Sequence, residues 1–251
     1  MELALHGRTA MITGASSGFG AHFARLFAAH GARVVIGARR VERVEALAAE
    51  LGDAALAVAM DVTDEASLIA AYDAAEARFG TVDTVIANAG TVMPGRSIDQ
   101  TLAEITSVVN TNFTGLYLTA REGARRMIKA GFKAHGRGRV VLIGSITAEM
   151  TGQGDSSYAA SKAAVAHLGR QFAREWVRAG INVNTIQPGY IQTEIADDWF
   201  QTPGGEAQIA AWHRQRLCPI EALDAPLLLL SSDASASITG ATLTVDDGQV
   251  L

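Results

Sequence analysis

The chain alternates between short apolar runs and longer segments in which apolar residues recur every three or four positions. The short runs are rich in β-branched residues, which is typical of strands buried in a sheet. We predict strands at 8–13, 33–38, 56–60, 82–87, 140–143, 181–187 and 242–245. The longer segments have the period of a helix. We predict helices at 21–30, 41–51, 65–79, 157–179 and 221–231, and a mostly helical stretch at 99–130.

Strands and helices alternate throughout residues 1–251, with no linker, repeat or low-complexity tract. This pattern predicts an α/β fold in a single domain, with a doubly wound parallel sheet and helices on both faces. The segment at about 190–217 is less regular and mixes polar with aromatic residues. We interpret it as a lid over a substrate.

Composition narrows the classes of protein that fit this fold. Hydrophobic residues make up 49% of the 251 residues, and the net charge of −5 argues against a general nucleic-acid binder. The basic residues at 121–139 fit a solvated helix face and its loop. The single cysteine, Cys218, fits a reducing compartment. The sequence has no Cys/His cluster with zinc-ligand spacing, no signal-peptide features and no segment long enough to cross a membrane. We therefore expect a cytoplasmic protein with no metal, membrane or nucleic-acid partner.

The first predicted strand runs directly into a glycine-rich motif that opens a helix. Gly14, Gly18 and Gly20 have the spacing G-x-x-x-G-x-G, and glycine lets the backbone turn tightly and approach a ligand. The helix start adds N–H groups and the positive end of the helix dipole. This combination favours binding of a dinucleotide pyrophosphate over a plain tight turn.

The second predicted strand ends in two cations, Arg39 and Arg40. A dinucleotide-binding fold usually carries an acid there for the adenosine 2′-hydroxyl. An arginine can instead pair with a 2′-phosphate, so we expect NADP, with NAD the less favoured cofactor. The alternative is that both arginines are only the basic start of the next helix.

Polar residues also follow the later strands. Asp61 either reaches an adenine amino group or closes its loop through an Asx hydrogen bond. Small residues at 88–90 would let the backbone approach the cofactor. Asn110 and Asn112 interrupt an apolar helical stretch, and because Asn is unfavourable inside a helix, we expect at least one of them to have a specific role.

Ser145, Tyr158 and Lys162 are the strongest candidates for chemistry. Tyr158 and Lys162 are four residues apart on a predicted helix and therefore share one face. A cation beside a phenol favours the phenolate and lowers the phenol pKa, which makes the phenol a usable acid or base. By itself the pair also fits a chance surface pair, but Ser145 and the glycine motif are expected at the same sheet edge.

Together these motifs resemble those of the short-chain dehydrogenase/reductase family, in order and spacing, over nearly the whole chain. The matching stretches are TGASSGFG at 13–20, Asp61-Val62, NAG at 88–90, Asn112, Ser145, YAASK at 158–162, Pro188-Gly189 and Thr193. The resemblance implies a seven-stranded Rossmann sheet in the order 3-2-1-4-5-6-7.

The family resemblance implies four catalytic residues. Tyr158 would be the acid in reduction and the base in oxidation, and Lys162 would lower the Tyr158 pKa and hold the nicotinamide ribose. Ser145 would hydrogen-bond the substrate oxygen. Asn112, rather than Asn110, would hold a water in a proton relay to Lys162.

The resemblance also implies the cofactor contacts. They are Gly14, Ser16, Gly18, Phe19 and Gly20 at the pyrophosphate, Asp61 and Val62 at the adenine, Asn88 near the adenosine ribose, and Pro188, Gly189, Ile191 and Thr193 at the nicotinamide. To these we add Arg39 and Arg40 at the 2′-phosphate, and Ala89 and Gly90 where the backbone approaches the cofactor, from the arguments above. Two positions depart from the family pattern. Many NADP-preferring relatives are basic where this chain has Ser17, and the RLCP at 216–219 replaces a common R-x-G-x-P.

Substrate choice is expected to come from the variable segments above the sheet edge. Besides Ser145 and Tyr158, the candidate substrate contacts are Met150, Gln153, Tyr190, Trp199 and Phe200. They predict a fairly bulky apolar or aromatic ketone or secondary alcohol. The alternative is that Trp199, Phe200 and Trp212 bury the lid helix against the domain or a neighbouring subunit.

The favoured function is hydride transfer between NADP(H) and a carbonyl or secondary alcohol. One alternative is an isomerase, epimerase or dehydratase that keeps its cofactor bound. Others are an NAD-preferring alcohol dehydrogenase and a nucleotide-sensing protein, although a sensor need not keep all four catalytic residues. The family resemblance further implies a homotetramer that packs the helices around 100–130 and 157–179.

Overall fold

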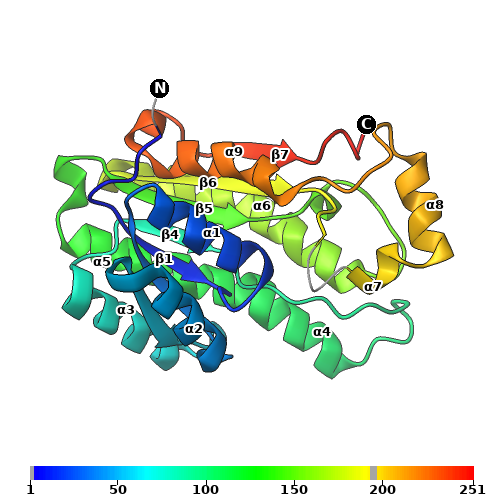
Figure 1. Cartoon of the computed structure of the whole chain (residues 1–251), viewed down its shortest axis with the longest axis horizontal. Coiled ribbons are helices and arrows are strands. Elements are labelled where there is room, and N and C mark those ends of the chain that lie inside the picture. Colours follow the sequence, from blue (N-terminus) through cyan, green and yellow to red (C-terminus); the bar gives the residue numbers. More distant parts are fainter. Residues whose placement is uncertain (1–2, 193–196) are drawn as a thin grey trace.

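The structure is a computed structural model that describes residues 3–192 and 197–251. Within these residues, seven parallel strands form one sheet in the order β3-β2-β1-β4-β5-β6-β7 (Figure 1). The strands are β1 (Thr9–Thr13), β2 (Arg33–Ala38), β3 (Ala55–Ala59), β4 (Thr84–Ala87), β5 (Gly138–Ile143), β6 (Ile181–Pro188) and β7 (Thr242–Val245). This confirms the predicted α/β class and the implied strand order.

Helices cover both faces of the sheet (Figure 1). They are α1 (Gly18–Ala29), α2 (Val41–Leu51), α3 (Glu65–Phe79), α4 (Leu102–Val109), α5 (Leu116–Lys129), α6 (Ser156–Trp176), α7 (Asp197–Phe200), α8 (Pro203–Ala211) and α9 (Asp224–Ser231). Short 3-10 turns lie at Gly52–Ala54, Phe132–Ala134, Ile146–Ala148, Val177–Ala179, Ile220–Leu223 and Asp233–Ser235.

Each face of the sheet has its own apolar core, because successive strand residues point to opposite sides. On β1, Met11 packs with the core under α3, α5 and α6, whereas Ile12 packs with the core under α1, α2 and α9. Both side chains are fully buried. The continuous apolar runs of the sequence are therefore the mark of a sheet covered on both sides.

The predicted helix at 99–130 is interrupted in the structure. Between α4 and α5 lies a π-helical segment, Asn110–Gly115, whose extra residue turns Asn112 into the interior. There the Asn112 side chain pairs with the backbone of Thr91. A π turn inside an α-helix is often found at functional sites.

The segment predicted to be irregular contains two helices, α7 and α8. Helix α8 begins at Pro203, and the Thr202 hydroxyl caps it by accepting from the Gly205 N–H. Both features are favourable at a helix N-terminus. In Figure 1 the two helices lie together beyond the ends of β6 and β7.

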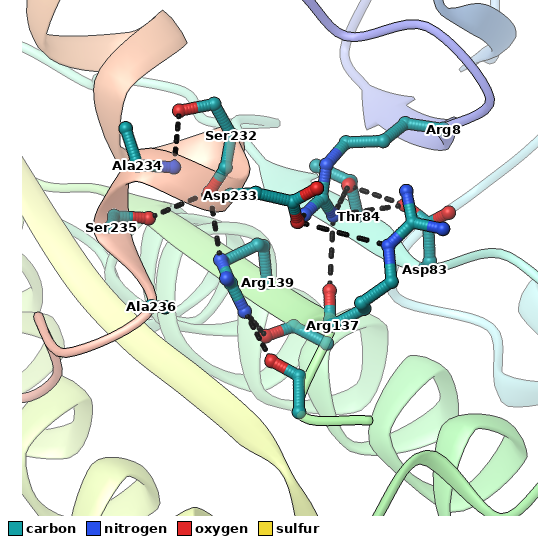
Figure 2. A network of polar contacts seen from close by, with 12 residues as sticks. Arg8, Asp83, Thr84, Arg137, Arg139, Ser232, Asp233, Ala234, Ser235 and Ala236 are labelled. Atoms are coloured by element: carbon teal, nitrogen blue, oxygen red, sulfur yellow. Dashed lines mark hydrogen bonds and ion pairs between the residues drawn. The ribbon is translucent and has the colours of Figure 1, made fainter. Parts of the chain in front are cut away.

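A buried polar network lies at the amino edge of the sheet (Figure 2). The Arg8 guanidinium is 2% exposed; it donates to Asp83 Oδ1 (3.3 Å) and Thr84 Oγ1 (3.2 Å) and also pairs with Asp233. Arg139, 1% exposed, donates to the Ser232 carbonyl (3.1 Å). The network joins β1, β4 and β5 to the segment after α9.

The expectation of a solvated basic face at 121–139 is wrong for two of its residues. Arg139 is buried in the network just described. Arg126 forms ion pairs with Asp73, Glu76 and Glu122 at 2.7–2.9 Å and is only 12% exposed. In both cases acceptors from distant parts of the chain replace water around the guanidinium, as burial of a charge requires.

The predicted motifs meet at the opposite, carboxyl edge of the sheet, because β1, β4, β5 and β6 are parallel and each motif follows its strand. Ligands of open α/β sheets bind at this edge. Across the two described stretches, no helix is long and apolar enough to cross a membrane. In the same residues, no group of three or more His, Cys, Asp or Glu is arranged to hold a metal ion.

Candidate active site

The glycine-rich loop links β1 to α1 at the carboxyl edge. Gly14 and Gly18 have φ values of +70° and +52°, which other residues rarely adopt. Gly20 is needed for another reason, since a Cβ there would lie 2.4 Å from the Gly14 carbonyl oxygen. The Phe19 ring stacks on Phe23 at the edge of the core and stays partly exposed. The N–H groups at the start of α1 form an anion-binding end.

Two exposed arginines follow β2 beside this loop. Arg40 donates to the hydroxyls of Ser16 (2.9 Å) and Ser17 (2.7 Å). Arg39 lies close enough to Asp61 for its charge to help lower the Asp61 pKa. These hydroxyl, guanidinium and N–H groups are all donors suited to phosphate oxygens.

The segment after β3 contains the loop-closing Asx hydrogen bond that was one of the two interpretations proposed for Asp61, whereas its contact with an adenine stays a prediction. Its Oδ1 accepts from the N–H (2.9 Å) and hydroxyl (2.7 Å) of Thr63, which is an Asx hydrogen bond. These bonds lower the Asp61 pKa. The carboxylate remains partly exposed at the ligand edge. The Val62 side chain is buried and packs against Gly115 of the π segment.

The residues after β4 join the sheet to the catalytic centre. Asn88 Nδ2 donates to the Thr13 carbonyl (2.9 Å), and the Ala89 N–H donates to Thr13 Oγ1 (3.1 Å), which ties β4 to β1 beneath the glycine loop. Gly90 lies between two candidate catalytic residues. A Cβ there would be 3.5 Å from Asn112 Oδ1 and 3.7 Å from Lys162 Nζ.

Asn112 is fully buried and forms hydrogen bonds with each of its polar atoms. Its Oδ1 accepts from the Thr91 N–H (2.8 Å), and its Nδ2 donates to the Thr91 carbonyl (2.9 Å) and to Ser161 Oγ (3.2 Å). The side chain thus holds the segment after β4 against α6. Both amide hydrogens go to protein acceptors, so a water in the expected relay would have to use the remaining Oδ1 lone pair or the backbone.

Ser145 follows β5 and is buried, with its hydroxyl oriented by Thr147. Ser145 Oγ accepts from the Thr147 hydroxyl (2.9 Å) and from the Thr147 N–H (3.2 Å). Because both acceptor positions are used, the hydroxyl hydrogen of Ser145 is left to donate. A hydrogen bond between the Ser145 and Tyr158 side chains is one of the causes that act on the Tyr158 pKa.

Tyr158 and Lys162 lie one turn apart on α6. Lys162 Nζ is 5.6 Å from the centre of the Tyr158 ring and donates to the Ile143 carbonyl (2.9 Å). Burial raises the pKa of Tyr158 to about 12, although the hydrogen bond with Ser145 lowers it. Burial lowers the pKa of Lys162 to about 8.

Burial therefore outweighs the other causes that act on the Tyr158 pKa, and the expected lowering of this pKa by Lys162 is not among those causes. The physical reason is that both groups lie in a poorly solvated environment, which favours the neutral phenol and the neutral amine. A phenol that keeps its proton at neutral pH is the form that can deliver a proton.

The segment after β6 packs under the C-terminal tail. The Gly189 N–H donates to the Val245 carbonyl (2.9 Å), which extends the pairing of β6, ending at Pro188, with β7. Ile191 is buried in the core and forms a parallel bridge with Cys218. Thr193, the last expected nicotinamide contact, lies outside the described residues.

The aromatic residues of the lid divide into a buried and an exposed group. The Tyr190 ring stacks on Trp212 (centroids 5.4 Å apart) and meets Phe200 edge-on (5.4 Å). Phe200 and Trp212 are buried, as the packing alternative requires. Trp199 is 53% exposed and donates to Gln208 Oε1 (2.9 Å).

The other two candidate substrate contacts lie between Ser145 and Tyr158. Met150 is half-buried and Gln153 is exposed. The Met150 N–H donates to the Ile146 carbonyl (3.1 Å), which closes the turn that follows Ser145.

Two residues near the chemistry were not singled out by the sequence. Thr147 orients Ser145, and its signal was the S-x-T spacing, which is typical of a local side-chain to backbone hydrogen bond. Asp155 is the N-cap residue of α6, three residues before Tyr158. Burial raises the Asp155 pKa, and its charge helps raise the Tyr158 pKa.

Comparison with known proteins gives matches along the whole chain. The model of the short chain dehydrogenase family matches residues 8–204. Cis-4-hydroxycyclohexanecarboxylate dehydrogenase of Sinomonas cyclohexanicum is 37% identical over 250 residues, which cover 96% of this chain and 96% of that protein.

Two solved structures share this architecture. A gluconate 5-dehydrogenase from Burkholderia cenocepacia J2315, in complex with NADP and tartrate, has a TM-score of 0.92 and 31% identity, covering 99% of this chain and 97% of that one. A 3-ketoacyl-(acyl-carrier-protein) reductase from Brucella melitensis, complexed with NADH, has a TM-score of 0.90 and 33% identity, covering 99% of this chain and 100% of that one. The names of the three proteins refer to different substrates, and the two complexes hold different dinucleotides.

Proposed function

The chain belongs to the short-chain dehydrogenase family, and from that premise we propose that it transfers a hydride between NADP(H) and a carbonyl group or secondary alcohol. The observation that carries this proposal is the group formed by Ser145, Tyr158 and Lys162. Their hydroxyl, phenol and amine lie on the segments that follow β5, at the same carboxyl edge of the sheet as the glycine loop after β1.

Each catalytic side chain has one task in carbonyl reduction. A bound nicotinamide would supply the hydride, so the protein needs only to position the substrate and move a proton. Tyr158 holds that proton on its phenol oxygen and delivers it to the carbonyl oxygen. Ser145 donates its hydroxyl hydrogen to the same oxygen and stabilises the charge that develops there, by about 2–4 kcal/mol if it equals an oxyanion-hole donor.

Lys162 and Asn112 support this proton transfer. The Lys162 amine lies beside the Tyr158 ring, where a positive charge stabilises the phenol oxygen as it loses its proton. Asn112 fixes the segment between Gly90 and α6, and through its remaining oxygen lone pair it would hold a water on the path from Lys162 to solvent.

The phosphorylated cofactor is proposed from the charges at the end of β2. Arg39 and Arg40 are the cations there, and Arg40 bridges to Ser16 and Ser17 of the glycine loop. A 2′-phosphate would find donors in both guanidinium groups. Because the solved relatives include complexes with NADP and with NADH, the preference for NADP is argued from this chain's own residues.

We propose a fairly bulky apolar or aromatic ketone, or the matching secondary alcohol, as the substrate. Tyr190 and Met150 are partly buried, and Trp199 supplies exposed apolar surface on the lid. Phe200 meets the Tyr190 ring edge-on, so we expect it to support that ring. Replacing Trp199 with Ala is expected to raise KM for bulky ketones more than for small ones.

The decisive experiment compares Tyr158→Phe with the parent chain in NADPH-dependent reduction of a ketone panel. We expect Tyr158→Phe to remove nearly all turnover while NADPH still binds, because only the phenol oxygen is lost. Tyr117→Phe, on a ring that packs against Phe172, is the matched control. Near-normal kcat in Tyr158→Phe would overturn the assignment.

The same panel tests the cofactor and the reaction type. A higher kcat/KM with NADH than with NADPH would contradict the proposed preference. Product formation without net loss of NADPH absorbance would favour an isomerase, epimerase or dehydratase over an oxidoreductase.

We propose that residues 1–251 act as one cytoplasmic catalytic domain, with a substrate lid at about 190–217, and assemble as a homotetramer. The assembly is supported by apolar side chains exposed on α4 and after α6, namely Leu102, Val109 and Val177. Light scattering at micromolar concentration tests the stoichiometry.

A further inference from the structure

The C-terminal tail, residues 246–251, contacts both ends of the lid segment 190–217. This tail follows β7 and has no part in the proton and hydride chemistry described above. Gln249 contacts the first residue of the lid segment, whereas Asp247 and Leu251 contact residues near its other end. Because different tail residues make the two sets of contacts, each set can be changed by its own substitution.

Gln249 holds the first residue of the lid segment. Its Oε1 accepts from the Tyr190 N–H (2.6 Å), and its Nε2 donates to the Tyr190 carbonyl (3.1 Å). The amide therefore pairs with the Tyr190 backbone in both directions, as a neighbouring strand would. Gln249 is buried, and a Cβ on Gly189 would lie 2.4 Å from its Oε1, so the amide has little room to move.

Asp247 holds the far end of the lid segment. Its carboxylate forms ion pairs with Arg214 (2.8 Å) and Arg216 (2.8 Å), and the side chain is only 12% exposed. His213 Nε2 lies 3.1 Å from the Leu251 carbonyl oxygen. The hydrogen bond with Arg216 lowers the pKa of Asp247, so the carboxylate stays charged across the neutral range.

The tail is shaped in advance for these contacts. Asp246 Oδ1 accepts from the Gly248 N–H (3.1 Å), and its Oδ2 accepts from the Val250 N–H (3.0 Å). Asp247 and Gly248 have φ values of +58° and +83°, a conformation that costs energy for Asp unless its surroundings require it. The turn thereby directs Asp247 and Gln249 to different ends of the lid.

The residue that Gln249 holds is adjacent to the chemistry. Tyr190 packs on Trp212 and Phe200 of the lid. Its phenol is also close enough to Tyr158 to contribute to the raised Tyr158 pKa. A shift of the Tyr190 backbone would therefore move both the aromatic core of the lid and one wall beside the proton donor.

We propose that Gln249 and Asp247 are positioning residues: the C-terminal tail clasps both ends of the lid segment and so sets Tyr190 against Tyr158 for substrate binding. The kinetic consequence of this clasp rests on the proposed carbonyl reduction. The structural consequence of the clasp does not rest on that function, because the reactivity of Cys218 can be used to measure whether the same contacts are intact. The Cys218 N–H donates to the Tyr190 carbonyl (3.0 Å), which also accepts from Gln249, and its side chain is 2% exposed.

The kinetic test compares Gln249→Leu with Gln171→Leu, an exposed glutamine on α6. We expect KM for the carbonyl substrate to rise about tenfold in Gln249→Leu while kcat changes less than about threefold, since the loss corresponds to about one buried hydrogen-bonded contact. General destabilisation would instead lower kcat through the active fraction and leave KM unchanged.

The structural test is the rate of alkylation of Cys218 by iodoacetamide in the intact protein. Because Cys218 is the single thiol, one rate is measured, and we expect it to rise about tenfold in Gln249→Leu. Asp247→Asn is expected to raise the rate less, because both arginine partners of Asp247 are more than half exposed and ion pairs of such groups are weak. Asp53→Asn, at an exposed pair with Arg78, serves as its control.

The results of the two tests distinguish failure of the clasp proposal from failure of the proposed function. If Gln249→Leu leaves both KM and the Cys218 rate within about twofold of Gln171→Leu, the clasp is refuted. If the parent chain reduces no ketone, the proposed function fails, and the alkylation rates alone decide on the clasp. Should Gln249→Leu not fold, Gln249→Met removes the same donor and acceptor with an unbranched side chain of similar length, and the same rise in rate is expected, with Gln171→Met as its control.

Discussion

At the scale of the residue, the site shows how a neighbour gives direction to a hydroxyl group. A serine hydroxyl alone rotates and can donate or accept. Ser145 accepts twice from Thr147, and this leaves its hydrogen for a partner on the cleft side. The role proposed for Ser145 therefore depends on the orientation that Thr147 gives to its hydroxyl.

Replacing Thr147 with Val keeps the volume of the side chain but removes the hydroxyl that donates to Ser145. We expect kcat/KM for carbonyl reduction to fall by about tenfold, the value of one ordinary hydrogen bond. Thr147→Ser retains the donor and is expected to keep most of the activity. Equal activity in Thr147→Val and the parent would show that Ser145 needs no such help.

The pH dependence of reduction is expected to follow Lys162. Because burial lowers its pKa to about 8, the amine is charged below that pH and loses its charge above it. Reduction needs the charge beside Tyr158, so kcat/KM is expected to be flat below about pH 8 and to fall by up to about tenfold per pH unit above it.

Lys162→Arg is the control, since a guanidinium keeps its charge over this range. If Lys162→Arg retains measurable activity, the decline above pH 8 should disappear. A parent profile that stays flat to pH 10 would contradict the assignment of the titrating group to Lys162.

At the scale of the element, the π segment between α4 and α5 connects parts of the site that are far apart in sequence. Gly115 lets the segment pack against Val62 after β3, and Asn112 fixes Thr91 after β4. Periodicity predicted the helix at 99–130 but not its interruption. The interruption depends on these tertiary contacts. The helical period of 3.6 residues in the sequence gives no signal for a single inserted residue.

Replacing Gly115 with Ala tests this packing. The new Cβ would lie 2.6 Å from Val62 Cγ2 and 3.0 Å from the Val62 carbonyl oxygen. We expect a loss of about 1–2 kcal/mol in the free energy of unfolding, because overpacking outweighs the better helix propensity of Ala. Urea unfolding of Gly115→Ala and the parent chain measures this difference in the free energy of unfolding.

Adding Val62→Ala removes the nearest atom and is expected to recover part of the loss. Gly95→Ala is the control, because its Cβ would meet only Gln100 Cγ at 3.8 Å. A fully stable Gly115→Ala protein would show that the π segment can shift away from Val62.

At the scale of the whole molecule, the two edges of the sheet have different roles. The carboxyl edge carries the site, whereas the amino edge carries the buried network around Arg8 and Arg139 (Figure 2). Burial lowers the pKa of Arg139 to about 10, so it still carries its charge at neutral pH. Burial raises the pKa of Asp83 in spite of Arg8, Thr84 and Thr9. Such a network is strongly destabilised when one partner is lost.

Arg8→Met is expected to reduce the free energy of unfolding by about 3 kcal/mol at pH 7, because Asp83 would be left as a buried carboxylate without its cation. The pKa of Asp83 is already raised, so the folded state favours its protonated form. Lowering the pH then neutralises this carboxylate, and the loss is expected to be smaller at pH 5 than at pH 7. Urea unfolding at both values checks the sign.

The double variant Arg8→Met/Asp83→Asn is expected to lose less free energy of unfolding than the two single variants lose in total. Arg78→Met, at the exposed pair with Asp53, should change stability little. A loss for Arg8→Met no larger than for Arg78→Met would contradict a structural role of the network.

The parts of the molecule that could be predicted are those set by local pattern. The strands, the glycine loop and the Tyr158–Lys162 spacing depend on residues close in sequence, and parallel strands bring the ends of β1, β4, β5 and β6 to one edge. The pKa directions and the buried pairing of Arg8 with Asp83 could not be predicted, because both depend on burial. The contact of Gln249 with Tyr190 joins residues 59 apart, and local pattern gives no signal for it.

The strand order also has a consequence during synthesis on the ribosome. Once β4 has emerged, β1 to β4 can pair with one another. The edge of β4 that will later face β5 has no neighbour until β5 is made, and 50 residues lie between the two strands. At about 5–20 residues per second this takes roughly 3–10 s. An unpaired edge strand is a template for aggregation. We therefore expect chains stalled between β4 and β5 to need chaperone protection that chains stalled after β7 do not.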